Sequence, residues 1–165
     1  MPVIVVKKNL DLISKAVLAL TKSEVMIGVP GGSGRSPEPG ETTAIDNAVL
    51  AYRLETGDPE TNLPARPFLV PGVESITGKA VELLKKAGKA AILGDSAAVE
   101  TALNKIGLIG QAAVQQRMTD GPFAPLAPRT LAARKARGRT GEKPLIDSGQ
   151  LRRSVTYIVR KKGSR

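Results

Sequence analysis

A shortage of aromatic rings constrains this chain more than any other feature of its sequence. Among 165 residues there are two phenylalanines, two tyrosines and no tryptophan. Aromatic side chains normally supply much of the area buried in a protein core. The interior must therefore be built from Ala, Val, Leu and Ile. The length fits a single domain, residues 1–165, with an aliphatic core of modest size.

The sequence also contains no cysteine and no histidine, which excludes several kinds of site. Disulfides, thiolate zinc sites and cysteine nucleophiles all require cysteine. Histidine-based triads and histidine-ligated metals require imidazole. No apolar run approaches the ~18–20 residues that span a bilayer, and residues 1–10 lack a signal-peptide pattern. We therefore expect no enzymatic activity, no cofactor and no membrane partner.

The formal net charge of +10 lies entirely in the last part of the chain. Residues 1–128 hold 13 Lys/Arg and 13 Asp/Glu, whereas residues 129–165 hold 12 Lys/Arg and two acids. Residues 129–143 are predicted to be a mobile basic segment that faces either acidic proteins or DNA. No aromatic residue is interleaved with its charges, which argues against stacking on single-stranded bases. Its basic residues are Arg129, Arg134, Lys135, Arg137, Arg139 and Lys143.

Hydrophobic periodicity predicts an α+β fold, in which a small mixed or antiparallel sheet packs against two long helices. Strands are expected at 2–6, 24–29 and 155–160. Helices are expected at 9–20, 42–57, 73–93, 96–120 and 130–137, with a short one beginning at Asp147. Residues 31–41 are predicted to be a flexible loop, and four prolines make 58–71 extended or looped. The buried stripes are predicted to include Leu10, Ile13, Val17 and Leu20 on the first helix, and Val49 and Tyr52 on the second.

Three local patterns carry more specific expectations. Gly107 and Gly110, on one helix, indicate close approach of another backbone. Phe68 is predicted to be the largest anchor of the core. The segment Gly72–Ala80 imitates a phosphate-binding loop, but its glycines are one residue too far apart and Ala80 replaces the metal-binding hydroxyl, so we reject a nucleotide site.

The segment around Asp147 gives the clearest local signal. Asp147 is predicted to be the N-cap of a helix, with Gln150 completing a capping box. Ile146 before the cap and Leu151 after it would form a hydrophobic staple. These residues would then serve structure rather than catalysis.

Two segments, taken together, resemble a known protein family. The first is LPARPFLVPGV at 63–73, which follows LAYRLETG; the second is KPLIDSGQLRRSV at 143–155, which follows GPFAPLAP. In this order, separated by two long helices, they resemble the tail-completion (neck, or head–tail joining) proteins of long-tailed bacteriophages. The resemblance covers about residues 24–160, although Leu54 stands where the family has an aromatic residue. The motif residues are Arg66, Pro67, Phe68, Pro144, Leu145, Ile146, Asp147, Gly149, Gln150 and Leu151.

The resemblance implies a virion structural protein, assembled in the host bacterial cytoplasm into the phage neck. Such a protein forms a ring, often a hexamer, between the head connector or stopper and the tail terminator or tube, with DNA passing through its lumen. Two alternatives stay open: another minor tail or virion morphogenesis protein, and a small basic nucleic-acid-binding protein. Arg66 would either pair with an acid at a subunit boundary or point to water. Replacement of Arg134, Lys135 and Arg137 by glutamine would impair particle joining more than folding.

Overall fold

The computed structural model describes residues 4–32, 34, 36–37 and 45–163. Within this described part there are seven α-helices, one short 3-10 helix and two β-strands. The contacts of the chain divide it into two compact units. Unit 1 comprises residues 1–27, 75–110 and 157–165, and unit 2 comprises residues 28–74 and 111–156. A division by contacts does not test whether each unit folds independently, so the single domain remains a prediction.

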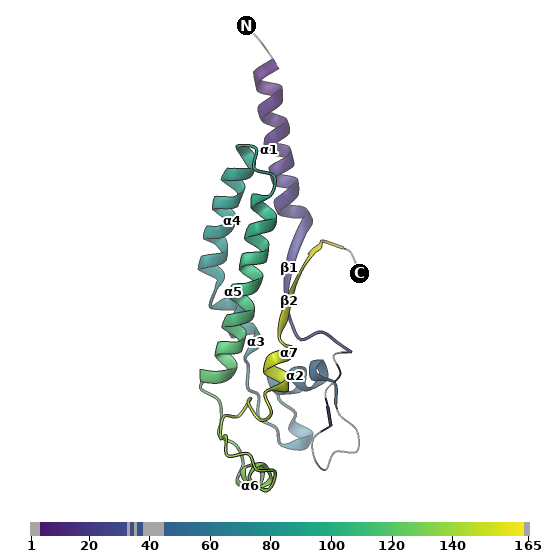
Figure 1. Ribbon diagram of the computed structural model, residues 1–165, viewed down its shortest axis with the longest axis vertical. Helices are drawn as coiled ribbons and strands as arrows, with labels where there is room; N and C mark the ends of the chain where they lie inside the picture. The colour runs from purple at the N-terminus through teal and green to yellow at the C-terminus, as the bar shows by residue number, and fades with distance from the viewer. Residues whose placement is uncertain (1–3, 33, 35, 38–44, 164–165) are drawn as a thin grey trace. The chain divides into compact units, whose positions relative to one another are not determined.

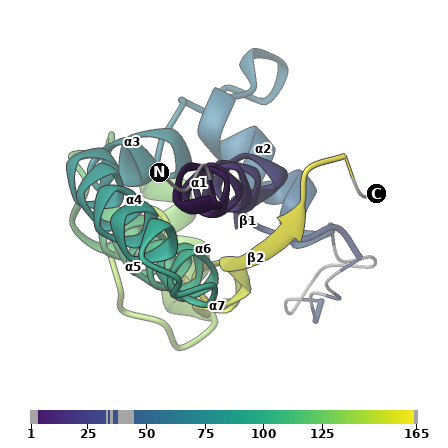
Figure 2. The same cartoon turned by 90° about the horizontal axis from the view of Figure 1, so that it is seen from above.

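Unit 1 contains the sheet and three long helical segments. Its elements are α1 (Ile4–Lys22), β1 (Ser23–Gly28), α4 (Thr77–Ile92), the first half of α5 (Ala98–Asp120) and β2 (Thr156–Lys161). Figures 1 and 2 both show α4 and α5 side by side, and α1 packs against α4. The two strands pair in one antiparallel sheet. The predicted α+β class, with a small sheet beside long helices, is therefore confirmed.

The register of the sheet explains the alternation seen in both strands. Beside the sheet the Lys162 amide donates to the Lys22 carbonyl at 2.7 Å, and Arg160 Nε donates to Glu24 Oε1 at 2.9 Å. This antiparallel register places Val25 opposite Val159, and both side chains pack against the core of unit 1. The neighbouring pair, Met26 and Ile158, points to the other face and is exposed.

The core of unit 1 is made largely of small side chains. Its buried members are Ala16, Ala87, Ala91, Val99, Ala102 and Leu103. On α1 the predicted stripe is wrong at Leu10, Ile13 and Val17, which are exposed while Ala16 is buried. Its last member, Leu20, does pack against this core. The alanine face allows α1 to approach α4 more closely than branched side chains would.

The start of the chain also differs from the expectation. Residues 4–6 are the first turn of α1, where a strand was predicted at 2–6, and Asn9, where the first helix was expected to begin, lies inside α1. Residues 1–3 lie outside the described part. A β-branched run is a weak preference, which the long helical segment that follows it overrides.

The helix expected at 73–93 is divided. Residues 69–74 form α3, and α4 then runs from Thr77 to Ile92 and stops before Gly94, whose φ is 103°. The next helix, expected at 96–120, is capped by Asp95: Asp95 Oδ1 accepts from the Ala97 and Ala98 amides, both at 3.1 Å.

Gly107 and Gly110 of α5 do mark a close approach, but of side chains from the sheet. A Cβ at Gly107 would lie 2.1 Å from Cδ2 of Tyr157, and one at Gly110 would lie 2.2 Å from Cδ1 of Ile27. The glycines thus create the depressions into which one face of the two-stranded sheet packs. This contact lies within unit 1.

Unit 2 consists of short helices connected by proline-rich segments. Its elements are α2 (Asn47–Thr56), the 3-10 turn Pro59–Thr61, α3 (Leu69–Glu74), the second part of α5, α6 (Pro128–Ala136) and α7 (Gln150–Ser154). Residues 58–71 are looped as predicted except at their end, where Pro71 lies in the first turn of α3. A proline is tolerated there because that amide has no partner within the helix.

The second helix begins later than the sequence predicted, and a different face of it is buried. It starts at Asn47, where Oδ1 of Asp46 accepts from the Ala48 amide at 2.6 Å. Its buried residues are Asn47 and Ala51, whereas Val49 and Tyr52 are exposed. Most of the predicted flexible loop, 31–41, lies outside the described residues, as do Thr42 and Thr43.

Candidate functional site

The first family-like segment is held by a carboxylate from α2. Glu55, near the end of α2, accepts hydrogen bonds from three successive amides: Phe68 and Leu69 at 2.7 and 2.9 Å, and Val70 at 3.0 Å. These amides open α3, so Glu55 caps that helix from another element and interacts favourably with its dipole. The signal in the sequence was the Glu-x-Gly that precedes Arg-Pro-Phe.

We expect Glu55→Gln to lower the free energy of unfolding by about 1–3 kcal/mol, because the amide offers one acceptor oxygen where the carboxylate offers two charged ones. Urea unfolding followed by circular dichroism measures the change. Glu60→Gln is the matched control, since Glu60 is exposed and the expected change is below ~0.5 kcal/mol. Equal effects of the two substitutions would contradict this role for Glu55.

Arg66 is buried. The residue is 4% exposed and so does not point to water, and it donates to the carbonyls of Ala124 and Pro125 at 3.2 and 3.3 Å. The acceptors belong to GPFAPLAP, a segment without regular structure whose carbonyls need donors from elsewhere. The pairing with an acid at a subunit boundary stays a prediction. Burial lowers the pKa of Arg66, and the charge of Arg134 lowers it further.

Phe68 and Pro67 follow Arg66 with opposite exposures. Phe68 is fully buried and is the largest such side chain in the described residues, as the sequence predicted. Pro67 is exposed. Together with Glu55, these residues make the Arg-Pro-Phe segment a rigid connection between α2 and α3.

Arg134 organises the second family-like segment. Its Nη1 donates to the carbonyls of Gly141 and Lys143, both at 2.9 Å, and of Ile146 at 3.0 Å, and its Nη2 donates to that of Pro144 at 3.4 Å. At 5% exposed, Arg134 is not available as an assembly or DNA-facing residue. Burial lowers its pKa, and the nearby Asp147 opposes that effect.

Asp147 does not cap a helix. It pairs with Arg134 at 3.5 Å, Arg137 at 3.3 Å and Arg139 at 2.8 Å. The N-cap of α7 is instead Gly149, whose φ of 78° favours glycine and which makes no side-chain capping bond. The predicted capping box and staple are therefore wrong. Three guanidinium groups bind the carboxylate that the local sequence pattern had assigned to a helix cap.

The remaining residues of that segment lie in several environments. Leu145 and Leu151 are buried, and Pro144 and Ile146 are half-buried. Gln150, in the first turn of α7, accepts from the Ser36 amide at 3.0 Å. It thus ties α7 to the described residues before α2.

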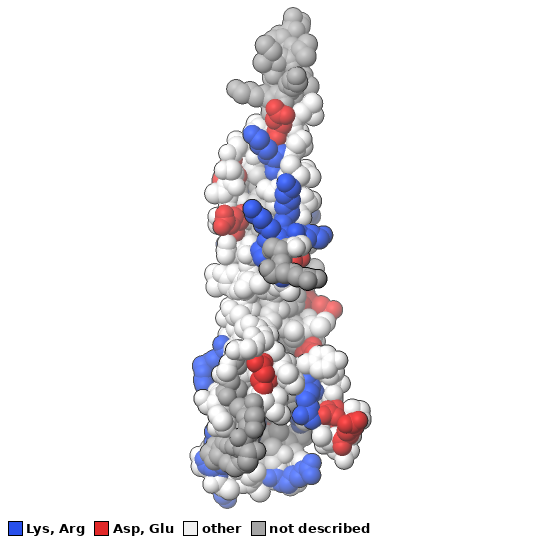
Figure 3. All heavy atoms as spheres, turned by 90° about the vertical axis from the view of Figure 1, so that its right-hand side faces the viewer, with Lys and Arg blue, Asp and Glu red and all other residues white. Residues whose placement is uncertain are grey.

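The predicted basic surface therefore divides into structural and free charges. Besides Arg134, Arg137 and Arg139 are held by Asp147, and Lys143 pairs with Asp120 at 3.3 Å. Lys135 and Arg129 are exposed on α6. Figure 3 shows basic side chains interspersed with acidic ones within each unit on the face that it displays. The mobility of 129–143 stays a prediction, against which these hydrogen bonds argue.

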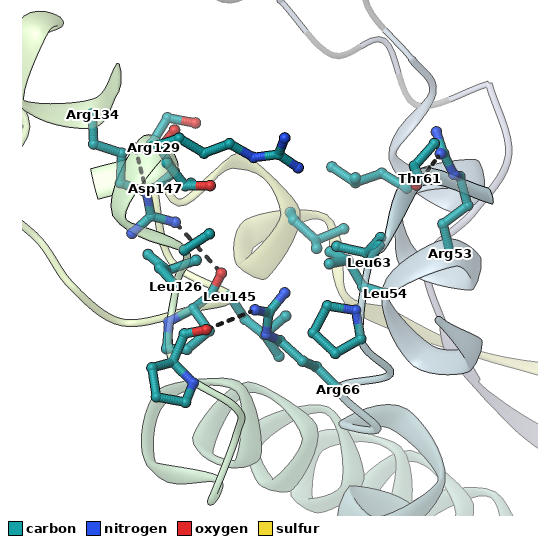
Figure 4. Close-up of a pocket in the computed structure, with 18 of the residues that line it drawn as sticks. Arg53, Leu54, Thr61, Leu63, Arg66, Leu126, Arg129, Arg134, Leu145 and Asp147 are labelled. Atoms are coloured by element: carbon teal, nitrogen blue, oxygen red, sulfur yellow. Dashed lines mark hydrogen bonds and ion pairs between the residues drawn. The ribbon is translucent and has the colours of Figure 1, made fainter. Parts of the chain in front are cut away.

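A cavity of about 490 Å³ in unit 2 is lined by residues of both family-like segments; we call it the arginine cavity. Figure 4 shows Arg53, Thr61 and Leu63 on one side of it and Arg134, Leu145 and Asp147 on the other. Its walls are largely apolar, with six leucines and three prolines. Those residues are Leu50, Leu54, Leu63, Leu126, Leu145, Leu151, Pro64, Pro125 and Pro144.

The lining of the arginine cavity is also unbalanced in charge. It includes four arginines, Arg53, Arg66, Arg129 and Arg134, and a single acidic residue, Asp147. Arg53 is already paired with Asp58, whose pKa that hydrogen bond lowers. Arg129 points into the cavity in Figure 4, and among the described residues it has no hydrogen-bond or ion-pair partner.

This arrangement suits the binding of a ligand. The cavity has a size typical of ligand sites, ~300–1,000 Å³, with apolar walls and a few polar groups. Across the described ranges, no three His, Cys, Asp or Glu side chains gather as a metal site would require. None of the helices that the structure describes is both long and apolar enough to span a membrane. The Gly72–Ala80 segment spans parts of α3 and α4, with Gly72 buried.

Comparison with known proteins yields no match: no protein-family model, no curated protein and no solved structure is significantly similar to this chain.

Proposed function

We propose that this chain is a structural component of the neck of a long-tailed bacteriophage, which joins the head connector to the tail through ring assembly. The observation that carries the proposal is the convergence of the two family-like segments. Leu54 and Arg66, from LETG and ARPF, line the same cavity of unit 2 as seven of the nine residues of KPLIDSGQL, and α2 packs against α7. Segments that are ~80 residues apart thus contribute to one binding surface, which supports a shared role.

Exposed apolar side chains are a second support. Four on α1 are between 42% and 56% exposed, and Tyr52 and Val49 of α2 are 69% and 51% exposed. Those on α1 are Leu10, Ile13, Val17 and Leu18. Groups of exposed large apolar residues mark surfaces that contact other proteins. In the proposed neck, one set of partners is further copies of the chain in a ring, a hexamer by the family resemblance. The other partners are the head connector or stopper and the tail terminator or tube.

The structure of the basic residues favours an assembly role over the nucleic-acid-binding alternative. Arg134, Arg137 and Arg139 are engaged by carbonyls or by Asp147, so few cations of the segment remain free for phosphates. Nonspecific contact with DNA in the ring lumen stays within the proposal. A tight DNA complex of the isolated chain does not, because such binding requires several free cations.

An amber mutation in the gene tests the proposal in the phage that encodes it. We expect DNA-filled heads and separate tails to accumulate, and the wild-type gene supplied in trans to restore joined particles. Joined, infectious particles formed without the protein would contradict the proposal. Binding of the purified chain to duplex DNA in 150 mM salt, with a salt slope of several phosphates, would favour the nucleic-acid-binding alternative instead.

A further inference from the structure

We propose that the arginine cavity binds a short acidic segment of another protein, with a carboxylate on Arg129 and adjacent apolar side chains against the leucine walls. This inference deepens the proposed function, on which it rests only in taking the partner to be a protein of the same assembly. It commits to one occupant because the charge and the walls of the cavity restrict the choice.

The charge of the cavity calls for an anion. Of its four arginines, Arg53 and Arg134 already face Asp58 and Asp147, and Arg66 donates to two carbonyls. Arg129 has no hydrogen-bond acceptor among the residues that the structure describes, and it points into the cavity from the first turn of α6. A carboxylate could accept two parallel hydrogen bonds from this guanidinium. Arg66, which pairs with no acid in the described part of the chain, would add attraction without contact.

The walls of the cavity determine what the anion must carry with it. Six leucines and three prolines surround the arginines, and no aromatic residue lines the cavity. A nucleic acid would find neither a stacking platform nor a row of free cations along its phosphates. An acidic residue flanked by Leu or Val satisfies both features, since the apolar side chains are buried while the charge is paired.

An array of hexapeptides tests this inference directly, each with a central Asp, Glu, Asn or Lys flanked by Leu, Val or Ser. Binding of the purified full-length chain is measured by fluorescence anisotropy on labelled members. We expect the Asp and Glu members with Leu or Val flanks to bind, and their Asn or Ser-flanked counterparts to bind at least about tenfold more weakly.

Three variants identify the residue responsible. Arg129→Gln should reduce the affinity for acidic members about tenfold or more, and Arg129→Glu should transfer the preference to the Lys members. Lys135→Gln is the matched control: it removes one charge from the same helix, is exposed, and does not line the cavity. The affinity of the Lys135→Gln variant for the acidic members should remain within about twofold of that of the original chain. Unchanged thermal unfolding of each variant excludes misfolding as the cause.

Two outcomes would overturn the inference: equal binding by the Arg129→Gln variant and the original chain, and absence of acidic peptides from those bound. Binding of a 20-base-pair DNA that depends on Arg129, without peptide binding, would assign the cavity to phosphate instead. The amber mutant distinguishes the two proposals, because head–tail joining that requires the protein, together with failed peptide binding, rejects only the cavity assignment.

Discussion

Replacing Arg134 with methionine is expected to lower the free energy of unfolding by about 3–5 kcal/mol. The guanidinium is the donor to four carbonyls between Gly141 and Ile146, and it pairs with Asp147. Methionine fills a similar volume but leaves these acceptors without a donor inside the protein. Urea unfolding measured by circular dichroism gives the change directly.

Lys135→Met is the matched control for that experiment. Lys135 is the next residue on the same helix and is exposed, so the expected change is within ~0.5 kcal/mol. The sequence alone led us to expect that Arg134, Lys135 and Arg137 act in assembly more than in folding. If Arg134→Met left stability unchanged while particle joining failed, that earlier interpretation would be correct and the structural role of Arg134 would be wrong.

Phe68→Ala is expected to have an effect of similar size, about 3–5 kcal/mol. Phe68 is fully buried, so its removal leaves a cavity that the surrounding side chains can fill only in part. Chemical unfolding is again the measurement. The change should appear as a lower midpoint, with little change in the denaturant slope.

Tyr52→Ala provides the contrast, since Tyr52 is an aromatic residue that is 69% exposed. Its expected effect on stability is below ~1 kcal/mol, because the ring contributes little burial in the free chain. If both substitutions destabilised the protein equally, Phe68 would not be the anchor that its burial indicates.

Local patterns predicted the elements whose side chains alternate or repeat over several residues. The strand at 24–29 was found from the spacing of Val25 and Ile27, and it is β1. The glycines of α5 were correctly assigned to a close approach, although the sequence could not show that Tyr157 and Ile27 side chains fill the space. Such signals are local, and tertiary contacts here agree with them.

Predictions from local patterns were wrong where a residue distant in the sequence determines the structure. Asp147 satisfies a capping pattern in sequence, yet arginines 8 to 13 residues before it claim its carboxylate. Glu55 lies in a turn-like context, but α3 supplies three amides to it across the unit. The buried face of α1 follows Ala16, because close packing on α4 selects small side chains over the more hydrophobic stripe.

The arginine cavity could not be derived from sequence for the same reason. Its lining comes from residues between Leu50 and Leu151, brought together by loops rich in proline. The basic segment was visible as charge, but the sequence did not separate the structural Arg134 from Arg129, which has no partner among the described residues. That separation depends on which guanidinium reaches unpaired carbonyls, and only the folded chain determines it.

Electron cryomicroscopy of the phage particle in which we propose that this chain acts tests the account most directly, with the neck resolved well enough to trace the chain. The account predicts a ring of this protein between the head connector and the tail, with unit 2 of each copy in contact with a neighbouring protein. A complete neck, traced from connector to tail tube and containing no copy of this chain, would contradict it.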